Sequence, residues 1–94
     1  MQVTQQDNGK KGVFSLQDGD QVAGEMSYTW AGEHMFIIDS THVDDGYRGQ
    51  NVGQTLLDSA IAFARERHIK ILPLCPFAKA MFDKHPEFAD VLNK

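Results

Sequence analysis

Residues Tyr47–Gly53 read YRGQNVG, and this short stretch decides how the rest of the chain is interpreted. It separates a strand-like run, MFIIDSTHV (35–43), from a helix-like run, QTLLDSAIAFARERH (54–68). Glycines before a helix let the backbone approach an anion closely, and the free amides of a helix N-terminus bind phosphate groups. The loop alone is equally compatible with a phosphate site and with a ligand-free connection between strand and helix.

Asn51 stands in this loop where phosphate-binding loops usually have glycine. Asparagine is the non-glycine residue that adopts the left-handed backbone conformation most readily. We therefore expect Asn51 to take that conformation and the loop to keep its shape, with ligand binding weakened rather than abolished.

The runs before the loop predict a three-stranded antiparallel meander. Segments 13–19 and 20–30 are strand-like and meet at turn-forming aspartates and a glycine, and 35–43 follows after a second turn. Residues 35–38 are apolar on both faces, which indicates an inner strand covered on both sides. Alternation at period two predicts that one face of the second strand holds Val22, Gly24, Met26, Tyr28 and Trp30, with Ala23 on the other.

The runs after the loop predict a helix, a short strand and a second helix. An apolar stripe at spacings of three and four defines the first helix: Val52, Leu56, Leu57, Ala60, Ile61 and Ala64. Pro73 cannot donate to a ladder, so the strand 69–75 should be at an edge, bulged or splayed. Pro76 suits the start of a helix over 76–85, and 86–94 has room for one further helical turn.

Composition indicates one soluble globular domain over residues 1–94. The chain is 41% apolar and 23% charged, and no apolar run approaches the ~20 residues of a membrane span. A net charge of −4 without a basic stripe argues against nucleic acid as a partner. The N-terminus lacks the apolar segment of a secretory signal, so a cytoplasmic location is the default expectation. One cysteine and four scattered histidines predict no disulfide and no structural metal.

Two segments, RGQNVG (48–53) and PLCPFA (73–78), give the chain a family resemblance. Arg48, Asn51 and Gly53 stand at the three defining positions of the pattern Gln/Arg-x-x-Gly-x-Gly/Ala, which resembles the acetyl-CoA loop of the GCN5-related N-acetyltransferase (GNAT) superfamily. PLCPFA is similar to a segment of its minimal subfamily of small chains. The resemblance covers about residues 12–92 and implies a mixed, mostly antiparallel α/β sheet of about four or five strands packed with two helices.

The same resemblance implies acetyl-CoA or CoA as cosubstrate, no metal, and an unidentified amine as acceptor. Loop amides would bind the pyrophosphate, the end of the third strand would pair with pantetheine, and the sheet would splay near Pro73 to admit that arm. The implied coenzyme-binding residues are His42, Val43, Arg48, Gly49, Gln50, Asn51, Val52, Gly53, Gln54, Cys75 and Phe77.

The catalytic residues are less well specified. Larger GNAT enzymes often have a tyrosine on the helix after the penultimate strand, where it protonates the leaving CoA thiolate, whereas the corresponding helix of this chain has Phe77 and Phe82. Cys75 precedes that helix, whose dipole favours a thiolate, so it is a candidate acyl-relay nucleophile; the alternative is a small buried apolar side chain. His42 is a weak candidate base, with Glu25 and Asp39 as similar candidates.

Two functions follow from the resemblance. One is an N-acetyltransferase, by direct attack of an amine on the thioester or by relay through Cys75. The other is an acyl-CoA-binding or sensing module without turnover, because the helices that build the acceptor pocket in larger members have no counterpart before VFSLQ (13–17).

Overall fold

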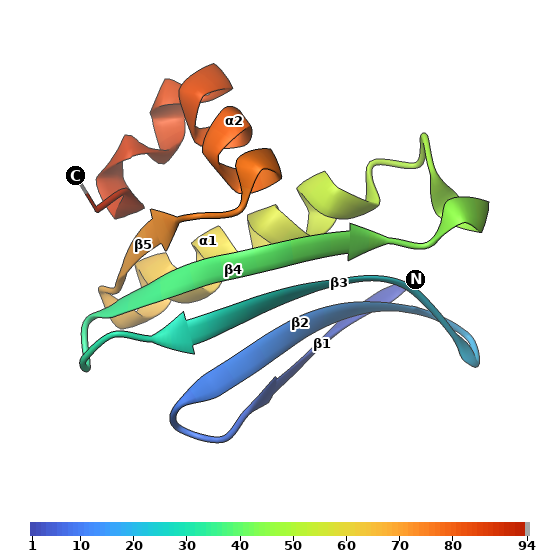
Figure 1. The fold of residues 1–94 in the computed structure, drawn as a ribbon, viewed down its shortest axis with the longest axis horizontal. Helices are drawn as coiled ribbons and strands as arrows, with labels where there is room; N and C mark the ends of the chain where they lie inside the picture. The colour runs from blue at the N-terminus through green and yellow to red at the C-terminus, as the bar shows by residue number, and fades with distance from the viewer. Residues whose placement is uncertain (94) are drawn as a thin grey trace.

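The computed structural model describes residues 1–93 and contains one five-stranded sheet with two α-helices (Figure 1). The sheet has the order β1-β2-β3-β4-β5, with antiparallel pairs throughout except for the parallel pair β4–β5. This is the predicted mixed, mostly antiparallel α/β fold. In chain order the elements are β1 (Gln2–Asp7), β2 (Lys11–Asp18), β3 (Gln21–Trp30), β4 (Met35–Val43), a 3-10 turn (Asp45–Tyr47), α1 (Val52–Arg67), β5 (Lys70–Pro73), α2 (Pro76–Lys84) and a second 3-10 segment (Pro86–Val91).

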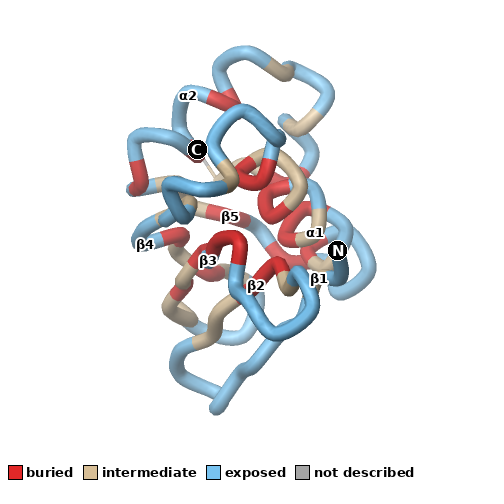
Figure 2. Tube along the Cα trace, turned by 90° about the vertical axis from the view of Figure 1, so that its right-hand side faces the viewer, coloured by how far each residue is buried: buried red, intermediate tan, exposed pale blue. Residues whose placement is uncertain are grey.

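Helix α1 covers one face of the sheet and forms the core with it (Figures 1 and 2). Every residue of its predicted apolar stripe is buried. Opposite the stripe lie Phe14, Met26, Tyr28, Phe36 and Ile38 from the three central strands. The amphipathic period of α1 therefore identified the helix and its buried side correctly.

The opposite face of the sheet stays partly open, which corrects the expectation for 35–38. Met35 and Ile37 are only half-buried, while Phe36 and Ile38 are fully buried against α1. The run is apolar on both sides, but the central part of the sheet is covered by α1 on only one face. β4 is an inner strand, as predicted, but it is not covered on both sides.

Two bulges interrupt the regular alternation of the strands. Leu16 pairs with Gly24 and Gln17 with Val22, so Ala23 is the extra residue of β3 and is buried, whereas Val22 is exposed. Strict alternation predicts the opposite, with Val22 on the face of Met26 and Tyr28 and Ala23 on the other. The prediction is wrong because the extra residue of the bulge shifts the alternation by one position, so that residues before it change faces. A second bulge leaves Asp39 of β4 outside the backbone register with β3.

β1 was not predicted. Its sequence, QVTQQD, has one apolar residue, Val3, which packs at the edge of the core. The strand pairs with β2 over its whole length, from Gln2↔Gln17 to Asp7↔Gly12. Cross-strand pairing rather than apolar patterning stabilises it, so its sequence carries little strand signal.

β5 is an edge strand whose pairing with β4 ends at Ile38↔Pro73, as the proline predicted. The amides of Leu74 and Cys75 then converge on the Ile38 carbonyl, at 3.2 and 3.1 Å, as the chain turns away. Pro76 is the first residue of α2, and 86–91 forms the expected extra turn. Neither helix of the described chain has the length and apolar character of a membrane span.

Candidate functional site

The N-terminus of α1 presents backbone amides that have no hydrogen-bond acceptor among the described residues. Asn51 has φ 58° and ψ 31°, which confirms the predicted left-handed conformation, and its carbonyl accepts the first helical bond from Thr55 at 3.0 Å. No side chain caps the helix, and its first turn has no acidic residue. From Gly49 to Gln54, only Gln50 donates its amide within residues 1–93, to the Tyr47 carbonyl at 3.3 Å. The remaining amides and the helix dipole together favour an anion at this point.

Side chains on both sides of the turn hold the loop in place. The Tyr47 hydroxyl donates to the carboxylate of Asp18 at 2.7 Å, which joins the loop to the β2–β3 turn and raises the pKa of Tyr47. Asp44 accepts the Gly46 amide at 3.0 Å. Arg48 forms an ion pair with Asp45 at 3.0 Å, and both side chains are largely exposed.

Two glycines allow the first turn of α1 to sit close to its neighbours. A Cβ on Gly24 would lie 2.6 Å from Val52 Cγ1 and 2.8 Å from the His42 carbonyl oxygen, so the helix rests directly on β3. A Cβ on Gly53 would lie 2.7 Å from Cζ of Phe77, whose ring covers the helix start from α2. The loop is therefore fixed between β3 and α2.

A cavity of about 390 Å³ opens between the loop and α2. Eight of the predicted coenzyme residues line it: Val43, Arg48, Gly49, Asn51, Val52, Gly53, Gln54 and Phe77. Tyr47, Met81 and Lys84 also line it and were missed by the sequence analysis. Phe77, Met81 and Lys84 are spaced by four and three residues along α2, so helical periodicity from Phe77 could have found the other two. Lys84 brings a second cation to the cavity beside Arg48.

Gln50, His42 and Cys75 do not line this cavity. The His42 side chain is exposed and its residue pairs with Glu25 of β3. The His42 carbonyl lies close to Gly24, and the Asp44 amide donates to the Ala23 carbonyl. The backbone groups of His42 and Asp44 therefore face β3. By alternation, Thr41 and Val43 direct their backbone groups to the free edge instead. His42 itself does not face that edge.

Cys75 lies beside this free edge of β4. The residue is 5% exposed, and its thiol donates to the Thr41 hydroxyl at 3.4 Å. The described residues of β5 offer β4 no partner beyond Ile38, so 39–43 is unpaired on that side next to Cys75. Cys75 is therefore buried, which fits its interpretation as a small buried side chain. It also lies beside the unpaired segment of β4 that is the candidate path for pantetheine.

The other candidate bases and any metal site can be placed briefly. Asp39 accepts a hydrogen bond from Thr29 at 2.5 Å, and Glu25 lies at 3.5 Å from the Ser15 hydroxyl that donates to it. Both contacts lie away from the loop cavity. Within residues 1–93, no three His, Cys, Asp or Glu side chains are grouped so that they could share a metal ion.

Comparisons with known proteins agree with this architecture. A family model described as GCN5-related N-acetyl-transferase matches residues 13–91. A GCN5-like protein from Staphylococcus aureus, with a structure solved by NMR in solution, is 32% identical with a TM-score of 0.77, and the match covers 98% of this chain and 87% of that one. The search of curated proteins returned no match.

Two larger enzymes share the fold at lower identity. Ribosomal-protein-alanine N-acetyltransferase from Brucella melitensis biovar Abortus 2308 is 15% identical, with a TM-score of 0.67 over 93% of this chain and 64% of its own. An aminoglycoside acetyltransferase from an uncultured soil metagenomic sample is 17% identical, with a TM-score of 0.65 over 88% of this chain and 57% of its own. The family model and the S. aureus relative carry the assignment: this chain belongs to the GCN5-related N-acetyltransferase family.

Proposed function

We propose that this protein binds acetyl-CoA at the start of α1 and transfers its acetyl group to an amine. The observation that carries the proposal is a set of five amides that have no acceptor within residues 1–93, at an uncapped helix N-terminus that opens into a cavity: Gly49, Asn51, Val52, Gly53 and Gln54. A pyrophosphate would accept hydrogen bonds from these amides, and Arg48 and Lys84 would add charge-assisted contacts from either side.

The pantetheine arm would lie along the free edge of β4, at residues 39–43, which β5 does not pair with. Pantetheine contains two amides, and an extended amide chain can hydrogen-bond to an unpaired strand as an added strand would. Thr41 and Val43 are the residues whose backbone groups this arm would meet. The thioester would then lie toward Cys75 and Thr41, where β5 departs from β4.

In direct transfer, the amine nitrogen attacks the thioester carbonyl carbon, the C–S bond breaks, and CoA leaves as a thiolate. The amine gives up one proton and the thiolate takes one up. α2 has no tyrosine to supply that proton. Orientation of the two reactants and stabilisation of the carbonyl oxygen would provide most of the acceleration.

In a relay, the Cys75 sulfur loses its proton and attacks the thioester carbonyl carbon, the C–S bond to CoA breaks, and CoA leaves as a thiolate that takes up a proton. The amine then attacks the carbonyl carbon of the acetyl-cysteine and gives up one proton, and the Cys75 sulfur leaves and regains one. The thiol must leave the Thr41 hydroxyl for the first attack, and its burial restricts the approach to the β4 edge. Incubation with acetyl-CoA followed by intact mass analysis distinguishes the two routes. The relay predicts one acetyl group on the wild type and none on Cys75→Ala; equal labelling of both excludes it.

The second candidate function is an acyl-CoA-binding module without turnover. It is favoured by the sequence of α2, which contains no tyrosine. The match spans 57–64% of the two larger enzymes. The two functions share the binding site and differ only in turnover.

Calorimetry with acetyl-CoA tests the binding site, and release of free CoA in the presence of a panel of amines tests turnover. The double variant Arg48→Gln/Lys84→Gln should weaken binding about tenfold or more, because it removes two charge-assisted contacts. Lys79→Gln is the matched control, since Lys79 is exposed on α2 and does not line the cavity. Binding with no CoA release would favour the module, and no heat with the wild type would exclude both functions.

A further inference from the structure

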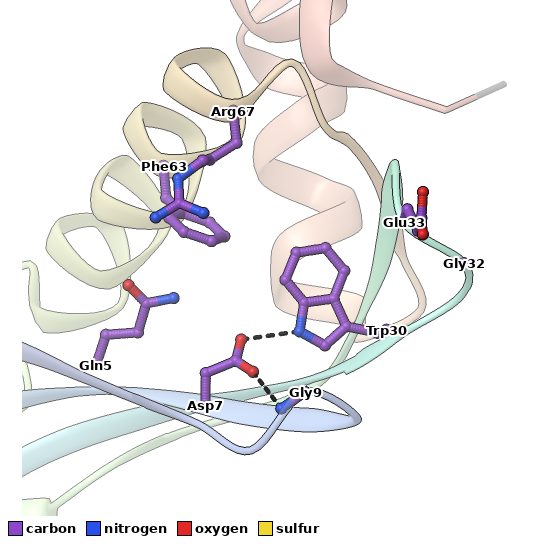
Figure 3. A pocket seen from close by; sticks show the side chains of 8 residues that line it. All are labelled: Gln5, Asp7, Gly9, Trp30, Gly32, Glu33, Phe63 and Arg67. Carbon is purple, nitrogen blue, oxygen red and sulfur yellow. Dashed lines mark hydrogen bonds between the residues drawn. The ribbon is translucent and has the colours of Figure 1, made fainter.

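A second hollow of about 590 Å³ lies at the other end of α1 (Figure 3). α1 has 16 residues, so its two ends are separated by about 24 Å. Residues from β1, from the end of β3, from the β3–β4 turn and from the last turns of α1 surround the hollow. It shares no lining residue with the loop cavity and does not depend on the proposed function.

Asp7 forms a fixed negative charge at the floor of this hollow. One carboxylate oxygen accepts the Tyr28 hydroxyl at 2.6 Å and the Trp30 indole N–H at 2.8 Å, and the other accepts the Gly9 amide at 2.7 Å. Gln5 donates to the same Tyr28 hydroxyl at 2.8 Å, which commits the tyrosine proton to Asp7. A carboxylate has about four acceptor positions, so this one keeps a position for a further donor.

The walls of the hollow are aromatic and carry one cation. Trp30 and Phe63 meet edge to face, with ring centroids 6.2 Å apart. The guanidinium of Arg67 lies over the Phe63 ring, 5.4 Å from its centroid (Figure 3). Among the described residues no carboxylate lies within ion-pair distance of Arg67, so its N–H groups are available to a ligand. Glu33, on the opposite rim, also has no hydrogen-bond or ion-pair partner there.

We propose that this hollow binds a basic amino acid. The α-carboxylate pairs with Arg67, the α-ammonium donates to the free position on Asp7, and the aliphatic side chain lies against Trp30 and Phe63. The side-chain cation reaches Glu33. The carboxylates of Asp7 and Glu33 and the guanidinium of Arg67 give the hollow one net negative charge. A basic amino acid has two positive groups and one negative group, so each charged group of the hollow has one group of opposite charge on the ligand.

The chain provides a built-in reporter for this site. Trp30 is the single tryptophan, and its indole N–H forms part of the wall, so its indole amide signal in a ¹⁵N-labelled sample reports occupancy directly. Three probes with related carbon skeletons separate the contacts. L-Lysine has all three charged groups, L-norleucine lacks the side-chain ammonium, and 1,5-diaminopentane lacks the carboxylate.

L-Lysine should shift the Trp30 indole signal saturably, and the other two probes should bind at least about tenfold more weakly, because each loses one charge-assisted pair. Arg67→Gln should weaken lysine binding about tenfold and should not weaken the binding of diaminopentane, which has no carboxylate for Arg67 to pair with. Arg65→Gln is the matched control, because Arg65 is two residues away on the same helix and pairs with Asp90 at 2.9 Å outside the hollow. It should bind lysine like the wild type.

Several results would overturn this proposal. They are the absence of a saturable shift with lysine up to about 10 mM, equal binding of norleucine or diaminopentane, and lysine binding that Arg67→Gln leaves intact. The comparison of the three probes uses the wild-type protein and so does not depend on the folding of a variant. Amide signals of Gly49–Gln54 should not move with lysine, so failure here is distinguishable from failure of the acetyl-CoA site.

Discussion

Asp45 is predicted to compete with the coenzyme for Arg48. The Arg48 guanidinium lies 3.0 Å from the Asp45 carboxylate, and the two side chains are 76% and 88% exposed. To reach a phosphate in the adjoining cavity, Arg48 must leave this partner. Replacing Asp45 by asparagine removes the competing charge while nearly preserving the size of the side chain, and acetyl-CoA should then bind more tightly.

The size of the effect follows from the exposure of the pair. Ion pairs this open to water contribute about 0.2–1 kcal/mol, which corresponds to a decrease in Kd of about 1.4- to 5-fold. Salt screens exposed charges, so the gain should shrink as ionic strength rises toward about 1 M. Isothermal titration calorimetry with acetyl-CoA at low and high salt measures both quantities.

A double-mutant cycle separates release of Arg48 from the loss of charge alone. Asp45→Asn in an Arg48→Gln background should give less improvement than in the wild type, because no guanidinium remains to be released. An equal gain in both backgrounds would refute the competition. So would an Asp45→Asn variant that binds acetyl-CoA no more tightly than the wild type.

Three further predictions concern Asn51 in the loop, Gly24 beneath the first turn of α1, and the hydrogen bonds that Asp7 of β1 accepts. Asn51→Gly should keep or raise coenzyme affinity. Asn51→Val should lose about 1–2 kcal/mol of stability in urea unfolding, because valine is strained at φ 58°; equal stability of the two variants would contradict the role of the left-handed residue. Gly24→Ala should lose about 1–3 kcal/mol in the same assay by overpacking against Val52, while Gly46→Ala, with no such contact, should change little. Burial alone would raise the pKa of Asp7, but the hydrogen bonds that its carboxylate accepts from Tyr28, Gly9 and Trp30 outweigh burial, and the pKa is lowered. The ionised carboxylate therefore stabilises the fold above the ordinary carboxyl pKa, and this contribution is lost as pH falls below about 4. Asp7→Asn should therefore be less stable than the wild type at pH 7 and approach it below that pH in thermal unfolding; a constant difference would oppose this reading.

The features that depend on local preferences could be predicted from the sequence. The stripe from Val52 to Ala64 required one buried face, so α1 and its orientation followed from periodicity alone. The left-handed Asn51 followed from the conformational preference of one residue type. Pro73 indicated the edge position of β5 and the end of its pairing with β4 because proline cannot donate to the ladder.

The features that were missed depend on contacts between distant residues. The Tyr28 hydroxyl that helps to hold β1 bonds to a residue 21 positions away, and the Thr41 hydroxyl that engages Cys75 is 34 positions from it. The bulge at Ala23 depends on how β2 and β3 pair, and the sequence of β3 alone does not specify that register. Lys84 lies on the same side of α2 as Phe77, as helical spacing indicates, and it lines the cavity because α2 packs beside the loop.

The most direct test of the central claim is a titration of ¹⁵N-labelled protein with CoA, followed by the backbone amide signals. The claim predicts saturable shifts concentrated at Gly49, Asn51, Val52, Gly53 and Gln54, the loop amides that have no acceptor in the described part of the chain. Pantetheine, which has no pyrophosphate, should leave these signals largely unchanged. Saturable binding of CoA that leaves the five amides unmoved, or no binding at all, would contradict the claim.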